Sequence, residues 1–461
     1  MILLPRLSPR AWRLCAALSL SLLLGACATP ARQAYVATTL SPAQRLQAYE
    51  EVVKTIAENY VNPDLNGVDW PAVTARYRPQ VLAAADDAAF WRALDHMVGE
   101  LKDAHTRVYS PEAVNALPWQ RGSFGLQLER VEGQLVLQRV SSASQAHLLG
   151  ARAGQRVLAV DEQAAADWLA AQLAQVRGSS TERSAMILVS RALNSRAMGS
   201  RLSLRLQGPD GPPFTVSLQQ QPATPPGLRV HQLDNGLAYV QLSVFNPLLW
   251  TDLEYAFKRL DKAKGLVLDL RGNGGGSLTT AIKLLSWLLP PGKVGEVQTR
   301  DNKRLTALLG LLDVTPKLEL TAQAGRLTQP LAVLVDDSSA SASELTAAVL
   351  QSQGRARVFG RTSCGCLLGV RGSGTSLAGG GRLSFSEVDM LIGPAAIRLE
   401  GVGVLPDEVL PLTLQSLQGR EDRDLAAAWA WLAAQPEAKP AAAAAAPSAA
   451  KPAVEPAKAG R

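Results

Sequence analysis

The spacing of apolar residues changes character along this chain. Between residues 41 and 102 apolar positions recur every three or four residues, most clearly over Gln44–Tyr60 and Asp87–Leu101, and this spacing predicts helices. From residue 119 to residue 218 apolar and polar positions alternate, a period that predicts strands with one buried face. The chain is therefore expected to begin with a helical region and to continue into a β-domain.

The alternating region resembles a PDZ domain. Its strands are predicted at Phe124–Leu128 and Gln134–Val140, and a Gly-x-x-x-Gly-x-x-Val-x-x-Val-Asp segment follows at Gly150–Asp161. In that fold an extended chain end adds to the sheet edge and backbone amides receive its carboxylate. The resemblance therefore implies peptide binding at Phe124, Gly125 and Leu126. A β-domain that serves only as a spacer is the alternative, and residues 170–200 are longer than the simplest PDZ domain needs.

Beyond residue 228 strands and helices alternate. Gly265–Leu270 is apolar except for Asp269, and Pro330–Val335 is continuously apolar. Amphipathic stretches follow at Thr279–Leu289 and Ser343–Gln353. Continuous apolar strands are typical of a sheet covered by helices on both faces. The pattern predicts an α/β core between residues 228 and 410.

Composition narrows the class of protein. The chain has 461 residues, of which 47% are hydrophobic and 19% charged, which excludes a wholly disordered chain, a collagen and a coiled coil. The net charge of +7 arises at the two ends, since residues 1–26 carry three arginines and no acid, and residues 438–461 carry four basic residues and one acid. The middle is nearly neutral and has no basic stripe with interleaved aromatics, so no nucleic-acid partner is expected.

The first residues are typical of a secretory leader. Arg6, Arg10 and Arg13 precede Cys15–Leu24, a run of apolar residues and serines too short to span a bilayer comfortably. Leu24-Gly25-Ala26-Cys27 resembles the bacterial lipobox, which implies lipid attachment at Cys27 and a membrane anchor. Ala28 follows instead of a retention aspartate, which by resemblance indicates the periplasmic face of the outer membrane. A plain secreted leader cleaved after Ala28 is the alternative.

Two loops after buried strands could carry chemistry. Arg271–Gly276 holds a glycine cluster, whose amides could approach a ligand as an oxyanion hole, bind phosphate or form only a tight turn. The sequence does not favour phosphate binding, because neither Gly-Lys-Ser/Thr nor GxGxxG is present. Asp336–Glu344 leads from small residues through Ser341 into a helix, the local geometry that exposes a nucleophile. Ser341 with Glu344 is equally a capping box.

Taken together, these loops resemble one family. Asp269–Gly276, Ser341–Glu344, Gly354–Gly360 and Glu400–Asp407 occur in the order found in the C-terminal processing peptidases, or tail-specific proteases, a family that includes the tricorn core and retinoid-binding relatives. The resemblance covers about residues 40–415. It implies a crotonase-like α/β protease core (ββα units), with an inserted PDZ β-domain and a helical N-terminal region.

The resemblance also assigns roles to residues. Ser341 is implied as the nucleophile of a serine-type endopeptidase, and the amides of Ala342 and of Gly274 or Gly275 as the oxyanion donors. The family's lysine base lies twenty-five positions after the nucleophile, where this chain has Cys366, and no lysine occurs between Lys317 and Lys439. A serine hydroxyl without a base is a poor nucleophile at neutral pH.

A histidine is the expected replacement for that lysine. Tricorn-type relatives place their catalytic histidine in the segment that matches Asp103-Ala104-His105, and a glutamate where Glu400 stands. A Ser341–His105 pair oriented or polarised by Glu400 satisfies the logic of nucleophile, base and orienting group. Ala104 departs from the family, since tricorn has a serine at that position.

Cys364 and Cys366 have several interpretations. In an oxidising compartment they could form a disulfide, a redox pair or half of a soft-metal site, and Cys366 could act as a thiolate base that competes as nucleophile. No second Cys/His cluster completes a zinc site, so no metal and no cofactor are expected.

The expected organisation combines these features. We divide the chain into a lipoprotein signal peptide at 1–26, a helical N-terminal region at 27–117, a PDZ-like domain at 118–222, a serine peptidase core at 223–418, a C-terminal helix at 419–436 and a disordered Ala/Pro/Lys tail at 437–461. The expected function is hydrolysis of protein or peptide substrates in the envelope, with selection through their C-termini. The alternatives are an inactive pseudopeptidase that binds polypeptide C-termini and a carrier of hydrophobic ligands.

Overall fold

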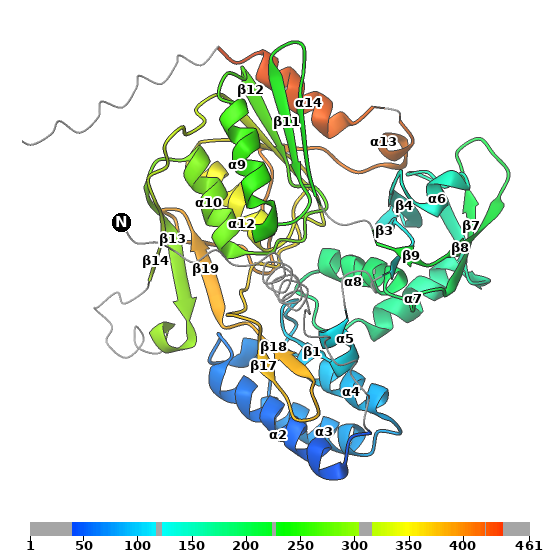
Figure 1. Ribbon diagram of the computed structural model, residues 1–461. Coiled ribbons are helices and arrows are strands. Elements are labelled where there is room, and N and C mark those ends of the chain that lie inside the picture. The colour runs from blue at the N-terminus through cyan, green and yellow to red at the C-terminus, as the bar shows by residue number, and fades with distance from the viewer. Residues whose placement is uncertain (1–38, 117–121, 224–226, 304–315, 420, 437–461) are drawn as a thin grey trace, which may run out of the picture. The chain divides into compact units, whose positions relative to one another are not determined.

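The computed structural model describes residues 39–116, 122–223, 227–303, 316–419 and 421–436 (Figure 1). The leader with Cys27 and the tail at 437–461 lie outside the described residues. Within the described ranges no helix is both long enough and apolar enough to cross a membrane.

Helices build the first part of the described chain. They are α2 (Pro42–Asn59), α3 (Trp70–Leu82), α4 (Asp87–Gly99) and α5 (Pro111–Asn115), with a 3₁₀ turn at Leu65–Gly67. Ser41 caps α2 through its hydroxyl and Gln44 completes the capping box. Val52, Ile56 and Leu94 are fully buried between these helices and pack against Leu383 from far along the chain. Leu383 reaches these helices because its strand, β18 (Arg382–Ser384), pairs with β1 (Arg107–Tyr109). On its other side β18 pairs with β17 (Thr375–Ser376).

A β-domain follows in the chain, with its own hydrophobic core. Its main sheet has the order β3-β4-β5-β7-β8, and β6 pairs with β5. Leu202, Leu204 and Leu206 alternate into the core, as the period of two predicts. The elements are β2 (Gly122–Ser123), β3 (Leu126–Val131), β4 (Gln134–Val140), α6 (Gln145–Leu148), β5 (Arg156–Val160), β6 (Gln163–Ala164), α7 (Ala165–Gln175), α8 (Glu182–Asn194), β7 (Arg201–Gln207), β8 (Phe214–Gln219) and β9 (Gln221–Pro222).

Two differences from the expected strands have local causes. The strand expected at Phe124–Leu128 begins only at Leu126, because Gly125 adopts φ +71° and turns the chain. The long stretch at 170–200 contains the helix α8, which packs along β3.

The third region is an α/β layer. Its sheet has the order β10-β11-β12-β15-β16-β21, and only the β10–β11 pair is antiparallel. Leu266 and Leu268 of β12 pack in the cluster that contains α9, α10 and α12, whereas Val267 packs in the cluster that contains α14, so helices cover both faces of the sheet (Figure 1). The elements are β10 (Leu228–Gln232), β11 (Leu237–Leu242), a 3₁₀ turn at Pro247–Leu249, α9 (Trp250–Arg259), β12 (Gly265–Asp269), α10 (Leu278–Leu288), β15 (Leu331–Val335), α12 (Ala342–Ser352), β16 (Arg357–Gly360), β21 (Glu408–Val409), α13 (Leu414–Gln418) and α14 (Arg423–Ala433).

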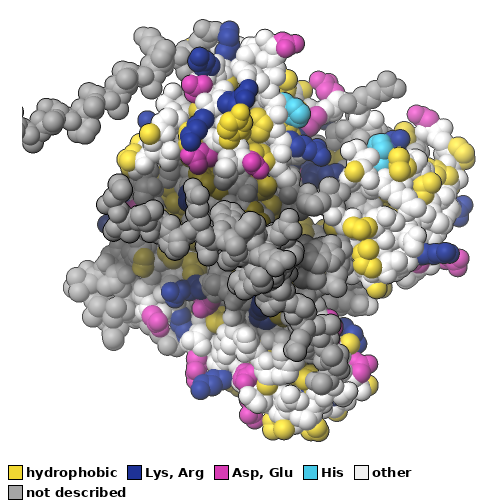
Figure 2. All heavy atoms as spheres, viewed as in Figure 1, with side chains coloured by type: hydrophobic (Ala, Val, Ile, Leu, Met, Phe, Trp, Pro, Cys, Tyr) yellow, Lys and Arg dark blue, Asp and Glu magenta, His cyan; other side chains and the backbone are white. Residues whose placement is uncertain are grey.

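A second sheet of this region has the order β14-β13-β19-β20. It is formed by β13 (Gly292–Thr299), β14 (Lys317–Leu320), β19 (Val388–Ile392) and β20 (Ile397–Arg398). Basic and acidic side chains are interspersed on the face of the molecule in Figure 2. The mixed α/β fold expected from the sequence is present, and its parallel strands place the loops that follow β12 and β15 next to each other.

Candidate active site

The glycine loop and the serine loop meet at one edge of the sheet. Strands β12 and β15 are neighbours and run parallel, so their carboxyl ends lie at the same edge. Asn273 joins the loops, because its carbonyl oxygen accepts the Ala340 N–H at 3.0 Å and the Ser343 hydroxyl at 2.8 Å. The two segments that the sequence singled out therefore form one structure.

Ser341 occupies a constrained turn between β15 and α12. Its φ of 55° and ψ of −117° lie in a region that side-chain-bearing residues rarely adopt. Its N–H donates to the Cys366 carbonyl and to Oε2 of Glu344, each at 3.0 Å. A serine held this way after a strand and before a helix has the geometry of a nucleophile elbow.

Backbone amides close to Ser341 differ in their hydrogen bonding. The Gly275 N–H already donates to Oδ1 of Asn273 at 2.9 Å. Among the hydrogen bonds of the described residues, none uses the N–H of Gly274 or of Ala342. A Cβ added to Gly275 would lie 3.0 Å from the Ala342 nitrogen, so the glycine loop directly faces the start of α12. Of the two glycines, Gly274 has the amide that is free to serve a ligand.

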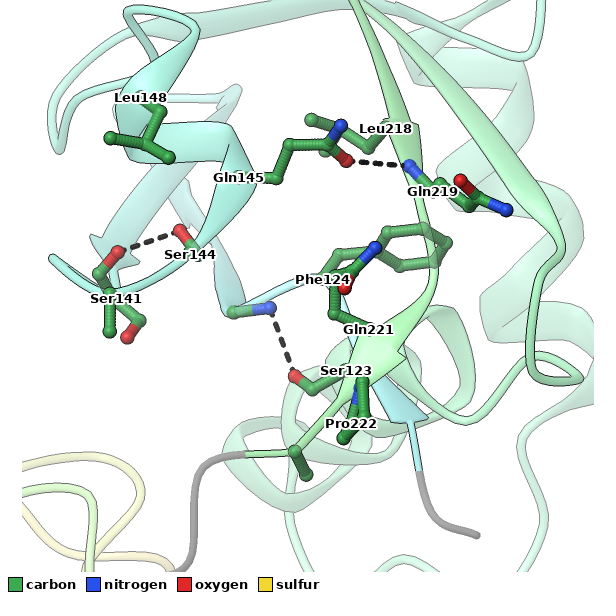
Figure 3. A pocket seen from close by; sticks show the side chains of 13 residues that line it. Ser123, Phe124, Ser141, Ser144, Gln145, Leu148, Leu218, Gln219, Gln221 and Pro222 are labelled. Atoms are coloured by element: carbon green, nitrogen blue, oxygen red, sulfur yellow. Dashed lines mark hydrogen bonds between the residues drawn. The ribbon is translucent and has the colours of Figure 1, made fainter. Parts of the chain in front are cut away.

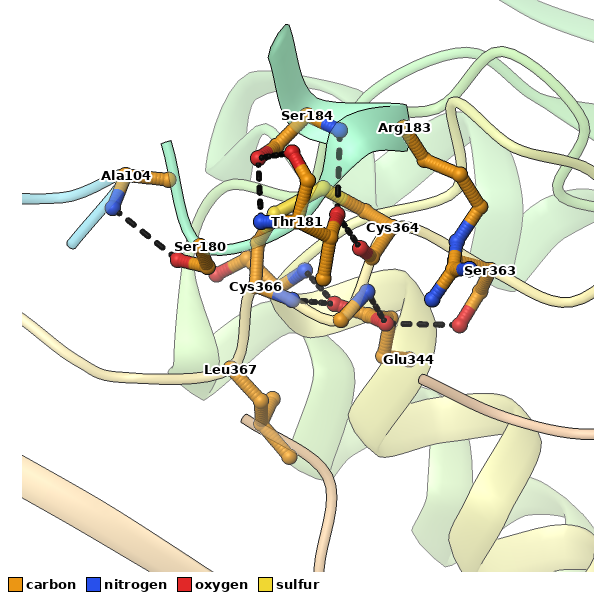
Figure 4. The surroundings of a disulfide bond; sticks show 12 residues. Ala104, Ser180, Thr181, Arg183, Ser184, Glu344, Ser363, Cys364, Cys366 and Leu367 are labelled. Atoms are coloured by element: carbon orange, nitrogen blue, oxygen red, sulfur yellow. Dashed lines mark hydrogen bonds between the residues drawn. A yellow bond between two sulfur atoms is a disulfide. The ribbon is translucent and has the colours of Figure 1, made fainter. Parts of the chain in front are cut away.

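The carboxylate of Glu344 organises the loops around Ser341. It is fully buried and accepts hydrogen bonds from the amides of Ser341, Gly365 and Cys366 and from the hydroxyl of Ser363, at 2.6–3.0 Å (Figure 4). Burial raises the pKa of Glu344, and these donated hydrogen bonds oppose the rise. Glu344 is thus more than a cap for α12, since it fixes the Cys364–Cys366 loop against Ser341.

A disulfide joins Cys364 and Cys366 in this loop (Figure 4). Both cysteines are buried, and in the disulfide neither sulfur is a thiolate that could act as a base. The Cys364 N–H donates to the Ser339 carbonyl at 3.0 Å, and the Cys366 carbonyl accepts the Ser341 N–H. Where the resemblance expects a lysine, the chain therefore supplies a backbone carbonyl that supports Ser341.

The imidazole of His105 lies beside Asp103 and is partly buried, with 22% of the side chain exposed. Its Nδ1 is 3.9 Å from Oδ1 of Asp103 and is buried without a hydrogen-bond partner. Burial lowers the pKa of His105 below its ordinary 6.5, which the Asp103 carboxylate opposes and Arg191 reinforces. No hydrogen bond between described residues joins His105 to Ser341. The imidazole is kept neutral, the form that a general base requires.

Glu400 lies between the serine loop and the histidine segment. One carboxylate oxygen, Oε2, accepts the amides of Leu367 at 2.7 Å and Leu368 at 3.1 Å. Burial and then the charge of Asp103 raise the pKa of Glu400 to about 7, opposed by a hydrogen bond from Ser180 and by the two amides. Leu367 directly follows Cys366, whose carbonyl accepts the Ser341 N–H. Glu400 therefore binds the backbone at the residue next to the one that holds Ser341.

The β-domain contacts the loop that carries Ser341. Arg139 pairs with Oδ2 of Asp336 at 2.8 Å, and Gln127 donates to the Ser338 hydroxyl at 2.5 Å. Burial would raise the pKa of Asp336, but Arg139 and Arg361 hold it below its usual value. The ion pair anchors β4 to the loop that begins after β15.

The turn expected to bind a peptide carboxylate is already engaged. Oδ1 of Asn194, at the end of α8, accepts the Phe124 N–H at 3.0 Å and the Leu126 N–H at 3.5 Å, and its amide donates to the Leu126 carbonyl at 2.7 Å. Ser190 likewise bonds both the N–H and the carbonyl of Leu128. The edge of β3 that pairs with no strand of its main sheet is therefore covered by the side chains of Asn194 and Ser190, from the same domain.

A cavity of about 620 Å³ adjoins this turn (Figure 3). It is lined by Ser123, Phe124, Ser144, Gln145 and Leu218 among others. The Gly125 N–H donates to the Ser123 hydroxyl at 2.9 Å, so this amide is engaged as well. A peptide carboxylate would therefore have to replace existing hydrogen bonds of the turn.

Sequence reasoning missed several residues of this region. Ser180 and Asn194 lie in no motif, and Asn273, although it lies in the glycine cluster, was given no role. Each acts through a contact with a residue 60 or more positions away. Glu344 was noticed only as a cap. In the described part of the chain no group of three or more His, Cys, Asp or Glu residues could hold a metal ion.

Comparisons with known proteins agree with this geometry. Residues 236–410 match the model of Peptidase family S41, and residues 41–99 match the Tricorn protease C1 domain. A carboxyl-terminal-processing protease of Synechocystis is 25% identical over 419 residues, which cover 87% of this chain and 88% of that protein. A chloroplastic C-terminal processing peptidase of Tetradesmus obliquus is 26% identical over 404 residues, covering 80% of this chain and 78% of that protein. A carboxy-terminal-processing protease of Bartonella bacilliformis is 29% identical over 229 residues, 45% of this chain, and the chain spans about half of that protein (49%).

Solved structures show the same fold. The photosystem II D1 C-terminal processing protease has a TM-score of 0.56 at 22% identity and covers 82% of this chain and 98% of its own. Mature CPAF has a TM-score of 0.61 at 14% identity, covering 82% of this chain and 94% of its own. The family match falls on the strands and loops that assemble Ser341, Asn273 and Glu400. Residues 236–410 therefore form a Peptidase family S41 domain, and the homologues of this chain include carboxyl-terminal-processing proteases.

Proposed function

We propose that this chain is an active serine endopeptidase of the C-terminal-processing type, with a histidine in place of the family's lysine. The observation that carries the proposal is the strained turn at Ser341, held against Gly275 and close to the amides of Gly274 and Ala342, which have no acceptor among the described residues. Backbone strain of this kind persists only where the surrounding structure enforces it, and it is typical of active sites. A helix cap alone does not need it, since the caps of the other described helices have a negative φ, as Ser41 does with −67° and Asp69 with −70°.

The proposed reaction proceeds by acyl transfer. The Ser341 oxygen attacks the peptide carbonyl while its proton passes to His105, and the carbonyl oxygen becomes an oxyanion held by the amides of Ala342 and Gly274. His105 then gives the proton to the leaving amine as the carbon–nitrogen bond breaks. Water hydrolyses the resulting ester on Ser341 with His105 again as base, which restores the serine.

His105 is supported as the base by its charge state and its connections. Its lowered pKa keeps the imidazole neutral at neutral pH, and its Nδ1 has no competing partner in the described structure. Glu400 contacts the backbone next to Cys366 and, through Ser180, the segment next to His105. We assign Glu400 the role of orienting and polarising this base.

Substrate selection is proposed to use the β-domain, which we interpret as a PDZ domain inserted before a crotonase-like core. A substrate C-terminus would add along β3 and place its carboxylate at Phe124, Gly125 and Leu126, displacing Asn194. The expected location, a periplasmic lipoprotein anchored through Cys27, remains part of this proposal and rests on the lipobox resemblance.

Cleavage of a defined substrate tests the proposal. Two unfolded polypeptides of identical sequence, one with a free C-terminus and one amidated, are incubated with the wild type and with Ser341→Ala, and the products are identified by mass spectrometry. Internal cleavage that requires Ser341 and prefers the free C-terminus is expected. An absence of cleavage, together with equal binding by wild type and Ser341→Ala, would indicate the inactive binder instead.

A further inference from the structure

A hydroxyl lies between the acidic residue and the histidine segment of the site. Ser180, in the connection between α7 and α8, accepts the Ala104 N–H at 3.1 Å on its Oγ (Figure 4). The same side chain hydrogen-bonds the carboxylate of Glu400. Ala104 directly precedes His105, so Ser180 connects Glu400 to the backbone that carries the imidazole.

The chemistry of a hydroxyl suits this position. A serine can accept one hydrogen bond and donate another at the same time, whereas the carboxylate of Glu400 only accepts. Two amides already occupy Oε2 of Glu400. Ala104 has a methyl group and supplies no hydroxyl of its own, and among the described residues Ser180 supplies the side-chain acceptor for its N–H.

The segment around Ser180 is fixed on both sides. On the histidine side, the Gly178 N–H donates to the Gly99 carbonyl at 3.0 Å. On the side of the disulfide loop, the Thr181 hydroxyl donates to the Cys364 carbonyl at 2.6 Å, and Arg183 donates to the carbonyls of Ser363 and Val402, both at 2.7 Å. A hydroxyl anchored this way has little freedom to leave its partners.

We propose that Ser180 is a positioning residue of the catalytic site, which holds Glu400 and the His105 segment in their working relation. The proposal rests on the proposed function and adds that the inserted β-domain contributes a residue to catalysis. Ser180 itself exchanges no proton with the substrate. Its hydroxyl keeps the carboxylate ionised to a lower pH and keeps the Ala104–His105 backbone in place.

Four variants test this role. Ser180→Ala removes the hydroxyl, Ser180→Thr retains one, Ser180→Val matches threonine in shape without it, and Ser179→Ala is the control at the neighbouring serine. The readouts are the pH profile of the rate constant for labelling by a fluorophosphonate probe, kcat and KM separately, and the thermal midpoint.

We expect Ser180→Ala and Ser180→Val to label about tenfold to hundredfold more slowly, the range set by one hydrogen bond to a charged group. The loss should fall on kcat, and the acid limb of the profile should move to higher pH, because Glu400 loses a donor that lowers its pKa. Ser180→Thr should recover most of the rate, and Ser179→Ala should behave as wild type.

The outcomes separate the two proposals. If wild type labels at Ser341 and Ser180→Val labels at the same rate and with the same pH profile as Ser180→Thr, the role of Ser180 is refuted and the proposed function stands. If wild type is not labelled at Ser341, both are refuted. The threonine–valine pair keeps the test valid even if Ser180→Ala does not fold.

Discussion

Replacing Gly275 by alanine tests whether the glycine loop positions Ser341 by close contact. An alanine Cβ at this position would lie 2.7 Å from Cβ of Ser341, 2.7 Å from the Ala340 oxygen and 3.0 Å from the Ala342 nitrogen. Carbon atoms prefer about 3.5 Å, so the Ser341 side chain would have to move by roughly 0.8 Å. The φ of Gly275 is +95°, which adds a backbone cost of about 1–2 kcal/mol for alanine.

The expected loss of activity follows from that displacement. A misplacement of about 1 Å costs on the order of a hundredfold in rate, so Gly275→Ala should slow fluorophosphonate labelling of Ser341 by about that factor. Gly354→Ala is the matched control, because Gly354 has φ +62° but nothing within 4 Å of its added Cβ. It carries a similar backbone cost without the contacts.

The comparison of both variants isolates the contact. Labelling rates and thermal midpoints are measured side by side: Gly354→Ala should lose about 1–2 kcal/mol of stability and keep the labelling rate of wild type. Gly275→Ala should lose more stability and most of the labelling. If Gly275→Ala labels within about threefold of Gly354→Ala, the nucleophile does not depend on this packing and the reasoning is wrong.

Three further outcomes are expected. Folding raises the pKa of Glu400 from 4.5 to about 7, so its contribution to stability is present below pH 4.5 and is lost as the pH rises through about 7. The thermal midpoint of Glu400→Gln should therefore fall less between pH 4.5 and pH 7 than the midpoint of wild type, and parallel curves of midpoint against pH would contradict the assignment. Asn194→Ala should bind a peptide with a free C-terminus more tightly by fluorescence polarisation, because the Phe124 amide loses its internal acceptor, whereas an unchanged Kd would show that α8 does not compete with peptides. Arg139→Ala should cost about 1–2 kcal/mol in denaturant melts at neutral pH, since the fully buried Asp336 loses its closest cation, while Arg361 at 3.9 Å, the donated hydrogen bonds of Gly272 and Ser338, and the partial exposure of Arg139 limit the loss. Because the pKa of Asp336 is depressed, this loss should shrink as the pH falls below about 3.8, and a loss independent of pH would contradict the ion pair.

Local patterns predicted much of the fold. Strand Gln134–Val140 has the bounds that its alternation suggests, and helix α4 starts at Asp87 as expected, because both patterns are set by neighbours along the chain. The almost continuously apolar strands that include Gly265–Asp269 and Leu331–Val335 predicted a sheet covered on both faces for the same reason.

Contacts between distant segments could not be predicted in this way. Ser180 and Ala104 are 76 positions apart, and nothing in the sequence around either residue indicates the hydrogen bond between them. The closure of β3 by Asn194 also depends on where α8 packs, which periodicity does not determine. The family resemblance named Ser341, His105 and Glu400, but the connections among them required the structure.

The central claim is that His105 activates Ser341. The most direct measurement is the second-order rate constant for fluorophosphonate labelling of wild type, Ser341→Ala and His105→Ala, with His96→Ala as the control and the labelled peptide mapped by mass spectrometry. We predict labelling at Ser341, no labelling of Ser341→Ala, and a rate lower by about a hundredfold or more in His105→Ala, the usual contribution of a general base. Labelling of His105→Ala at the rate of wild type would contradict the account.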